Sequence, residues 1–212
     1  MTIQVNKTNN ICYGKYEGSA FVSIHNGTPP YTVRWFDNSS DTLINNLHAG
    51  NYMLDVIDAC YSFISNSFSI TEPNSLSATE TIKDVRCFGN SDGEITISPS
   101  GGTQPYSYLW SNGTSNAFIK NIAAGDYIVT ITDNCGDQLM KYIHVSEPPI
   151  LTSSINKTDV TCFYGGDGTA TVNVSGGTYP YTYTWSIGQN TATAIGLFPG
   201  MQTVNIVDFY GC

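Results

Sequence analysis

The sequence has 212 residues, only 12% of them charged, and a formal net charge of −9. The eight Lys and Arg residues are scattered along an acidic chain, which excludes the basic patch of a nucleic-acid-binding protein. No run approaches the roughly 18 to 20 apolar residues of a membrane-spanning helix. The chain is rich in Thr, Ser, Asn, Gly and Tyr, and this composition predicts an all-β protein.

One stretch rich in Gly, Pro and aromatic residues occurs three times at a constant spacing. The copies are Gly27–Trp35, Gly102–Trp110 and Gly177–Trp185, and successive Trp residues are 75 positions apart. A constant period with Gly, Pro and Trp in register indicates one folding unit copied in tandem. The sequence therefore predicts three domains, residues 1–74, 75–149 and 150–212.

Each repeat is predicted to begin with two strands. The first covers Leu76–Lys83 in repeat 2 and Leu151–Lys157 in repeat 3, and Met1 falls at the position of Leu76. In repeat 1 the second strand is Gly18–His25, where alternate residues occupy the inward face of a half-buried strand. Met1 thus falls inside a strand, and no signal peptide precedes it, so we expect a segment of a longer array.

The glycine-rich turn leads into a strand that ends at the Trp. In repeat 1, Tyr31, Val33 and Trp35 share one face of this strand by a period of two. A Trp at this place is the large apolar plug that immunoglobulin-type sandwiches hold between their sheets. We therefore predict that Trp35, Trp110 and Trp185 are core residues; the alternative is an exposed Trp and Tyr platform that stacks on sugar.

A Tyr after a short turn recurs in the first two repeats. Tyr52 lies in Leu47–Asp58, and Tyr127 lies at the matching place in Ile122–Asp133. The pattern predicts a tyrosine corner, in which the Tyr hydroxyl donates back to the preceding backbone. Repeat 3 has Gln202 at this position, so its corner must be held in another way.

The last predicted strand of a repeat is Ser62–Ile70 in repeat 1 and Gln138–Val145 in repeat 2. Each ends at a Glu-Pro pair, and these short linkers predict a rod-like array of repeats. Cys212 falls where the last strand of repeat 3 should begin. We expect the continuing chain or a neighbouring copy to supply that strand, because a bare sheet edge is normally avoided.

The six cysteines follow the same register, with one pair in each repeat. The pairs are Cys12 and Cys60, Cys87 and Cys135, and Cys162 and Cys212. We predict one disulfide within each repeat, with buried free thiols as the alternative. Closing a loop of about 48 residues would add ~4 kcal/mol in the chain-entropy model and would imply an oxidising compartment.

Acidic residues recur at two positions of the repeat. The weak calcium candidates are Asp58, Asp92, Asp133, Asp167 and Asp208. Calcium needs several converging oxygens, whereas Asp residues in turns commonly bind their own backbone. We expect no other cofactor, and His25, His48 and His144 are out of register, so no metal cluster or catalytic triad is predicted.

Six sequons offer candidates for N-glycosylation. They begin at Asn6, Asn26, Asn38, Asn112, Asn156 and Asn173.

Three segments together resemble the SprB-repeat family: Cys87–Gly93, Gly101–Trp110 and Ala124–Asp133, followed by Cys135. The family consists of tandem modules of bacterial gliding-motility adhesins and other large surface proteins, and similar modules occur in proteins of very large DNA viruses. The resemblance implies tandem immunoglobulin-like β-sandwiches and a surface role, and it brings no catalytic residues.

The sequence thus predicts a structural and adhesive protein, not an enzyme, that forms a stalk or fibre in the extracellular space or on the cell surface. The alternatives are a module that binds surface glycans or other surface proteins, and a structural protein of a virion. The predicted partners are further repeats of the chain or neighbouring copies. Any binding surface is expected in the segments that differ between copies, which are 36–46, 111–117 and 186–193.

Overall fold

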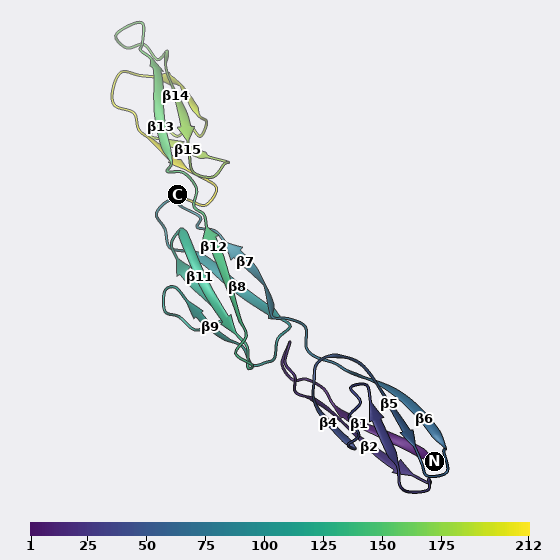
Figure 1. The fold of residues 1–212 in the computed structure, drawn as a ribbon. Coiled ribbons are helices and arrows are strands. Elements are labelled where there is room, and N and C mark those ends of the chain that lie inside the picture. Colours follow the sequence, from purple (N-terminus) through teal and green to yellow (C-terminus); the bar gives the residue numbers. More distant parts are fainter. The chain divides into compact units, whose positions relative to one another are not determined.

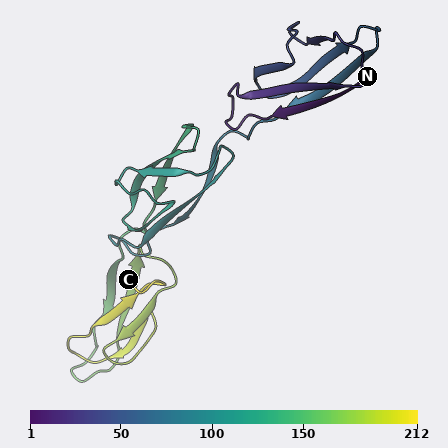
Figure 2. The same ribbon diagram turned by 90° about the horizontal axis from the view of Figure 1, so that it is seen from below.

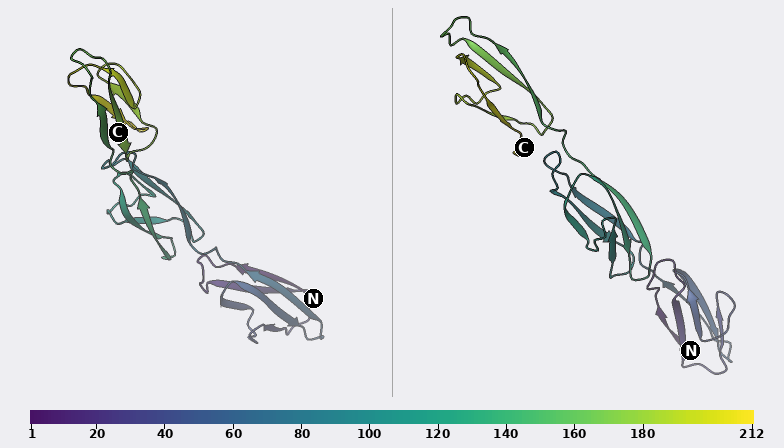
Figure 3. Two further views of the ribbon diagram at one scale, coloured as in Figure 1. Left: turned by 90° about the horizontal axis from the view of Figure 1, so that it is seen from above. Right: turned by 90° about the vertical axis from the view of Figure 1, so that its left-hand side faces the viewer.

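The computed structural model describes all 212 residues and contains 17 strands and no helix (Figure 1). The all-β prediction is therefore confirmed. Since there are no helices, none has the length and apolarity that crossing a membrane requires. Figures 2 and 3 show the strands from further sides.

The strands fall into three sets that follow the sequence repeat. The first set is β1 (Thr2–Thr8), β2 (Gly18–His25), β3 (Thr32–Trp35), β4 (Leu43–Leu47), β5 (Gly50–Ile57) and β6 (Phe63–Ile70). The second set is β7 (Ser77–Lys83), β8 (Gly93–Ser100), β9 (Ser107–Trp110), β10 (Phe118–Ile122), β11 (Gly125–Thr132) and β12 (Gln138–Val145). The third set is β13 (Thr152–Thr158), β14 (Gly168–Ser175), β15 (Thr182–Trp185), β16 (Thr193–Leu197) and β17 (Val204–Val207).

The sheet order is that of an immunoglobulin-like sandwich. The first set forms sheets β1-β2-β4 and β3-β5-β6, and the second forms β7-β8-β10 and β9-β11-β12. The third set forms β13-β14-β16 and the pair β15-β17. Immunoglobulin domains likewise divide their strands, with the third strand leaving the first sheet to pair in the second. The prediction of tandem immunoglobulin-like repeats is confirmed by this topology.

Contacts within the chain group it into two compact units. One comprises Met1–Thr79, Ser98–Leu109 and Thr130–Met140, and the other comprises Glu80–Ile97, Trp110–Val129 and Lys141–Cys212. The second strand set contributes to both units. The boundaries at 74/75 and 149/150 that the repeat predicts are therefore not the boundaries between these units.

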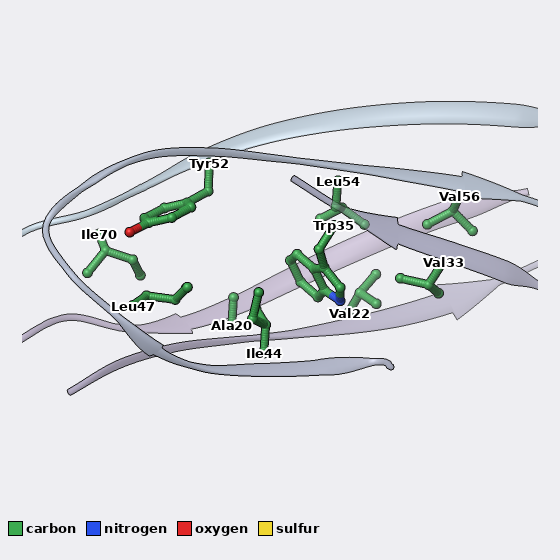
Figure 4. Packing of buried hydrophobic residues seen from close by; sticks show 10 residues of the cluster. All are labelled: Ala20, Val22, Val33, Trp35, Ile44, Leu47, Tyr52, Leu54, Val56 and Ile70. Atoms are coloured by element: carbon green, nitrogen blue, oxygen red, sulfur yellow. The ribbon is translucent and has the colours of Figure 1, made fainter. Parts of the chain in front are cut away.

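The Trp residue of each repeat lies in the core. In the first set, the Trp35 ring lies among side chains from both sheets, including Val22 and Leu54 (Figure 4). The exposed fractions of Trp35, Trp110 and Trp185 are only 2%, 2% and 3%. Each indole N–H donates to a backbone carbonyl six residues later, at 2.6 to 2.9 Å. A platform that stacks on sugar needs an exposed ring face, which these side chains do not offer.

One strand of each repeat was not predicted. It is β4 in the first set, and its counterparts are β10 and β16; each overlaps or directly follows one of the segments that differ between copies. The pairing of β4 with β2 shifts register between Gly18 and Ala20, and Asn46 has a φ of 56°. Because of this shift, Ile44 and Leu47 are both buried although they are three positions apart in the sequence. A search for alternation by two therefore misses this bulged strand.

The third sandwich is open on one side. Strand β17 pairs only with β15, whereas β5 has a neighbour on each side. In the first set Ile70 of β6 packs against Gly18, and in the second Val145 of β12 packs against Gly93. Gly168 is approached by Val160 and Leu197 instead, and a hollow of about 560 Å³ lies beside these residues.

The tyrosine hydroxyls bridge the turn before the fifth strand of their set. Tyr52 donates to the carbonyl of His48 at 2.8 Å, and Tyr127 donates to that of Ala123 at 2.9 Å. Tyr52 is 6% exposed and stacks against Phe68 of β6. The hydroxyl thus fixes the turn between the two sheets. In the third set Gln202 instead accepts a hydrogen bond from Ser186 at 2.9 Å.

Replacing Tyr52 by Phe should therefore lower the free energy of unfolding of the first repeat by about 1 kcal/mol, because it leaves the His48 carbonyl unpaired and keeps the ring. Chemical denaturation followed by fluorescence measures the change. The matched control is Tyr61→Phe, since Tyr61 is 88% exposed. Equal midpoints for the two variants would contradict this role of the hydroxyl.

Candidate functional site

The structure contains two disulfides, Cys12–Cys135 and Cys87–Cys212. Cys60 and Cys162 are free and exposed. The prediction of one disulfide within each repeat is therefore wrong. In both bonds, the first cysteine of one repeat is joined to the second cysteine of the next repeat. Each compact unit contains one of the bonds.

Strand geometry explains why a repeat cannot close its own pair. Cys12 follows β1, at the end of the sandwich where Gly50 begins β5 opposite Ile70. Cys60 follows β5 at its other end, where Ile57 faces Phe63. Eight residues of strand span about 26 Å. A disulfide requires Cα atoms within about 7 Å, so the two cysteines of one sandwich are far out of reach.

The turn that carries the second cysteine is organised by a buried aspartate. One oxygen of Asp58 accepts the N–H groups of Cys60 and Ser62, both at 2.9 Å, and the other accepts that of Thr28 at 3.1 Å. Asp133 and Asp208 repeat this arrangement. The carboxylate thus ties the second-cysteine turn to the turn that precedes the Trp strand.

These hydrogen bonds also set the charge state of the aspartates. The N–H groups of Ser62 and Thr28 hold the pKa of Asp58 below its usual value. Burial would raise the pKa of Asp133, but the N–H donors, led by that of Thr103, outweigh it and the pKa is lowered. The same balance lowers the pKa of Asp208. All three therefore act as anions that accept backbone hydrogen bonds.

The loop that carries the first cysteine is held by the other repeated acidic position. Glu17 accepts the N–H groups of Ile11 and Cys12 at 3.2 and 3.3 Å. Asp92 accepts the N–H of Arg86 at 3.1 Å and forms an ion pair with its guanidinium. Asp167 plays the same part in the third repeat.

Asp167 accepts the N–H of Thr161 at 3.1 Å and its hydroxyl at 2.6 Å. These bonds lower the pKa of Asp167.

A glutamate after the last strand holds the first-cysteine loop from its other side. Glu72 accepts the N–H of Gly14 at 2.8 Å, and Glu147 accepts that of Gly89 at 2.7 Å. The two residues of each pair are 58 positions apart, and this constant Gly-to-Glu spacing is visible in the sequence although no single motif shows it.

The geometry of the repeated acidic residues does not favour a calcium site. The oxygens of Asp58, Asp92, Asp133, Asp167 and Asp208 face hydrogen-bond donors of the protein. No three His, Cys, Asp or Glu side chains gather where they could hold a metal ion. The contacts instead agree with the alternative given above, that the repeated acidic residues bind the backbone of their own turns.

One contact accompanies the first disulfide. The hydroxyl of Thr103 donates to the carbonyl of Ile11, beside Cys12, at 2.6 Å. Thr103 also supplies an N–H to Asp133, two residues before Cys135. The turn before the Trp strand, which contains a cis Gln104–Pro105 peptide, therefore lies between the two cysteine-bearing segments.

The other predicted candidates lie on the surface. All six sequon asparagines are exposed: Asn6, Asn26, Asn38, Asn112, Asn156 and Asn173. Their glycosylation stays a prediction. His144 pairs with Asp126 at 2.7 Å on an exposed surface, far in sequence from the other two histidines.

A family model described as the SprB repeat matches residues 5–40, 79–115 and 154–190, just over half of the chain. The chain belongs to the SprB-repeat family. The three matched ranges include the first cysteine and the Trp of each SprB repeat. They end before the second-cysteine turns.

Among solved structures, the chain is similar to arrays of immunoglobulin domains. The alignment with Sidekick-1 immunoglobulin domains 1–5 has 10% identity and a TM-score of 0.45, and it covers 100% of this chain and 57% of that chain. For the N-terminal four Ig domains of Dscam1 isoform 6.44 the identity is 12%, the TM-score 0.30 and the coverage 100% and 70%. For the amphioxus IgVJ-C2 molecule the identity is 15% and the TM-score is 0.30, and the alignment covers 68% of this chain and 96% of that chain. No curated protein matches the chain.

The aspartate turns make the SprB repeats sensitive to acid. Because the pKa of Asp58 is lower in the folded state, its contribution to stability is complete above the unfolded value of about 3.9 and is lost as the pH falls further. Asp58→Asn should lower the denaturation midpoint at neutral pH. The difference from the parent should shrink as the pH falls below about 4.

The matched control is Asp41→Asn, an exposed position. It should leave the midpoint nearly unchanged across the same pH range. A difference between Asp58→Asn and the parent that stays constant with pH would contradict the role of the ionised carboxylate.

Proposed function

We propose that the chain is a structural and adhesive segment of a surface protein, in which covalently joined SprB repeats form a stalk or fibre. Membership of the SprB-repeat family supports this proposal. The observation that carries it is the pairing of cysteines between successive repeats. Such bonds add nothing to a binding pocket, but they change how the chain transmits force.

The two disulfides define a short covalent path through the chain. Tension between the ends passes from Cys12 to Cys135, back along the chain to Cys87, and then to Cys212. Residues 13–86 and 136–211 lie outside this path and bear no load. A protein that must stay anchored under tension gains from this arrangement, because residues 13–86 and 136–211 add no length when they unfold.

Three further parts belong to the proposal. The repeats are taken as domains with the limits 1–74, 75–149 and 150–212. The protein works outside the cell or on its surface, since the disulfides require an oxidising compartment. Its partners are further repeats or copies of the chain and components of other surfaces.

Stretching single molecules by their ends tests the mechanical role. Oxidised protein should extend to only about 210 Å when fully unfolded, because about 60 residues at ~3.6 Å each remain in the path. Reduced protein should reach about 760 Å. Equal extension of both forms would contradict the proposal.

The Cys12→Ser/Cys135→Ser double variant sharpens this experiment. Only Cys87–Cys212 then remains, and the extension should be about 310 Å. With one disulfide inside each repeat, the same variant would keep only Cys162–Cys212 and would extend to about 580 Å. The second value would show that the load path described above does not exist.

A further inference from the structure

The two free cysteines are the unused halves of a repeating bond. In both disulfides the first cysteine of a repeat bonds the second cysteine of the repeat that follows. Cys162 is the first cysteine of the third repeat, and Cys60 is the second cysteine of the first repeat. A bond between them on two molecules would continue the same pattern.

Cys60 is held by the same backbone contact as the bonded Cys135. The N–H of each donates at 2.9 Å to the aspartate two residues before it, Asp58 or Asp133. Cys212 lies two residues further along its turn, and its N–H donates to Asp208 at 3.0 Å. The free second cysteine therefore already has the turn that a bonded one requires.

Cys162 likewise matches Cys87. The carbonyl of Cys162 accepts the N–H of Gly165 at 2.8 Å, and that of Cys87 accepts the N–H of Asn90 at 3.0 Å. The residue before each cysteine donates its N–H to the repeated aspartate, at 3.1 Å in both cases. The residue before Cys162 and the turn that Cys162 starts are thus held as at Cys87, although Tyr164 has a φ of 120° where Gly89 has a φ of 75°.

The side chain after the first cysteine is more exposed at the free Cys162 than at the two bonded cysteines. This residue is Tyr13, Phe88 or Phe163 in the three repeats, always a large aromatic. It is 44% and 52% exposed beside the two bonded cysteines but 81% exposed beside Cys162. The ring of Phe163 thus offers more uncovered apolar surface than its counterparts do where a disulfide is present.

We propose that copies of this chain join head to tail through a disulfide between Cys162 of one copy and Cys60 of the next. The partner of the third repeat is the first repeat of a second copy, because that repeat carries the free Cys60 in the same aspartate turn that holds the bonded Cys135. A contact between two different surfaces does not close on itself, so repetition of the bond builds a linear polymer.

The bond forms by thiol–disulfide exchange with a small disulfide such as oxidised glutathione. The thiolate of one cysteine attacks a glutathione sulfur, forms a mixed disulfide and releases one glutathione thiolate. The thiolate of the other chain then attacks the protein sulfur of that mixed disulfide and releases the second. Two protein thiols are oxidised and one glutathione disulfide is reduced. This assembly goes beyond the proposed stalk, which needs only the bonds within one chain.

The test incubates the oxidised 212-residue protein with a glutathione redox buffer and separates the products on a non-reducing gel. The parent should give a ladder of multimers that reducing agent collapses to monomer. Mass spectrometry of the ladder should find the peptide of Cys162 joined to that of Cys60.

Two single variants, Cys60→Ser and Cys162→Ser, make the test specific. Each alone should lose all multimers, whereas their mixture should give a heterodimer and nothing larger. Intact mass should show that both variants keep the two internal disulfides, which establishes that they fold. Homodimers of either variant alone, or a parent that yields only glutathione-capped monomer, would overturn the proposal.

Discussion

The rest of each repeat depends on one buried carboxylate. Asp58, Asp133 and Asp208 each join the turn before the Trp strand to the turn that carries the second cysteine. The first turn sets where the Trp strand enters the sandwich, and the second sets where the cysteine leaves it. Because three N–H donors converge on one anion, both turns are fixed without a metal ion or a large core. This suits a unit of about 75 residues, which has little apolar surface to bury.

The cysteines follow from this arrangement. A sandwich whose two cysteines lie at opposite ends cannot close a disulfide of its own, so its thiols are available to other repeats. The bonds Cys12–Cys135 and Cys87–Cys212 use that property, and the open positions at Cys60 and Cys162 extend it. Stability within a repeat therefore comes from the sandwich and its hydrogen-bonded turns, whereas the disulfides govern how repeats are joined.

The sequence allowed much of the fold to be predicted, because the chemistry of strands and turns is local. Alternation by two gave β2, and the three Trp residues marked the third strand of each set. Strand β4 was missed, since its bulge spaces Ile44 and Leu47 by three. The cysteine pairing could not be predicted from the sequence, because the equal spacing of the cysteines does not show at which end of a sandwich each one lies. The sequence around Asp58 fits a turn residue and a calcium ligand equally well, because the N–H of Thr28 that it accepts comes from 30 positions away.

Peptide mapping shows most directly whether the disulfides join successive repeats. Free thiols are first alkylated, the protein is digested without reduction, and the linked peptides are identified by mass spectrometry. We expect Cys12 linked to Cys135, Cys87 linked to Cys212, and alkylated Cys60 and Cys162. A peptide that links Cys12 to Cys60 would contradict this pairing between repeats.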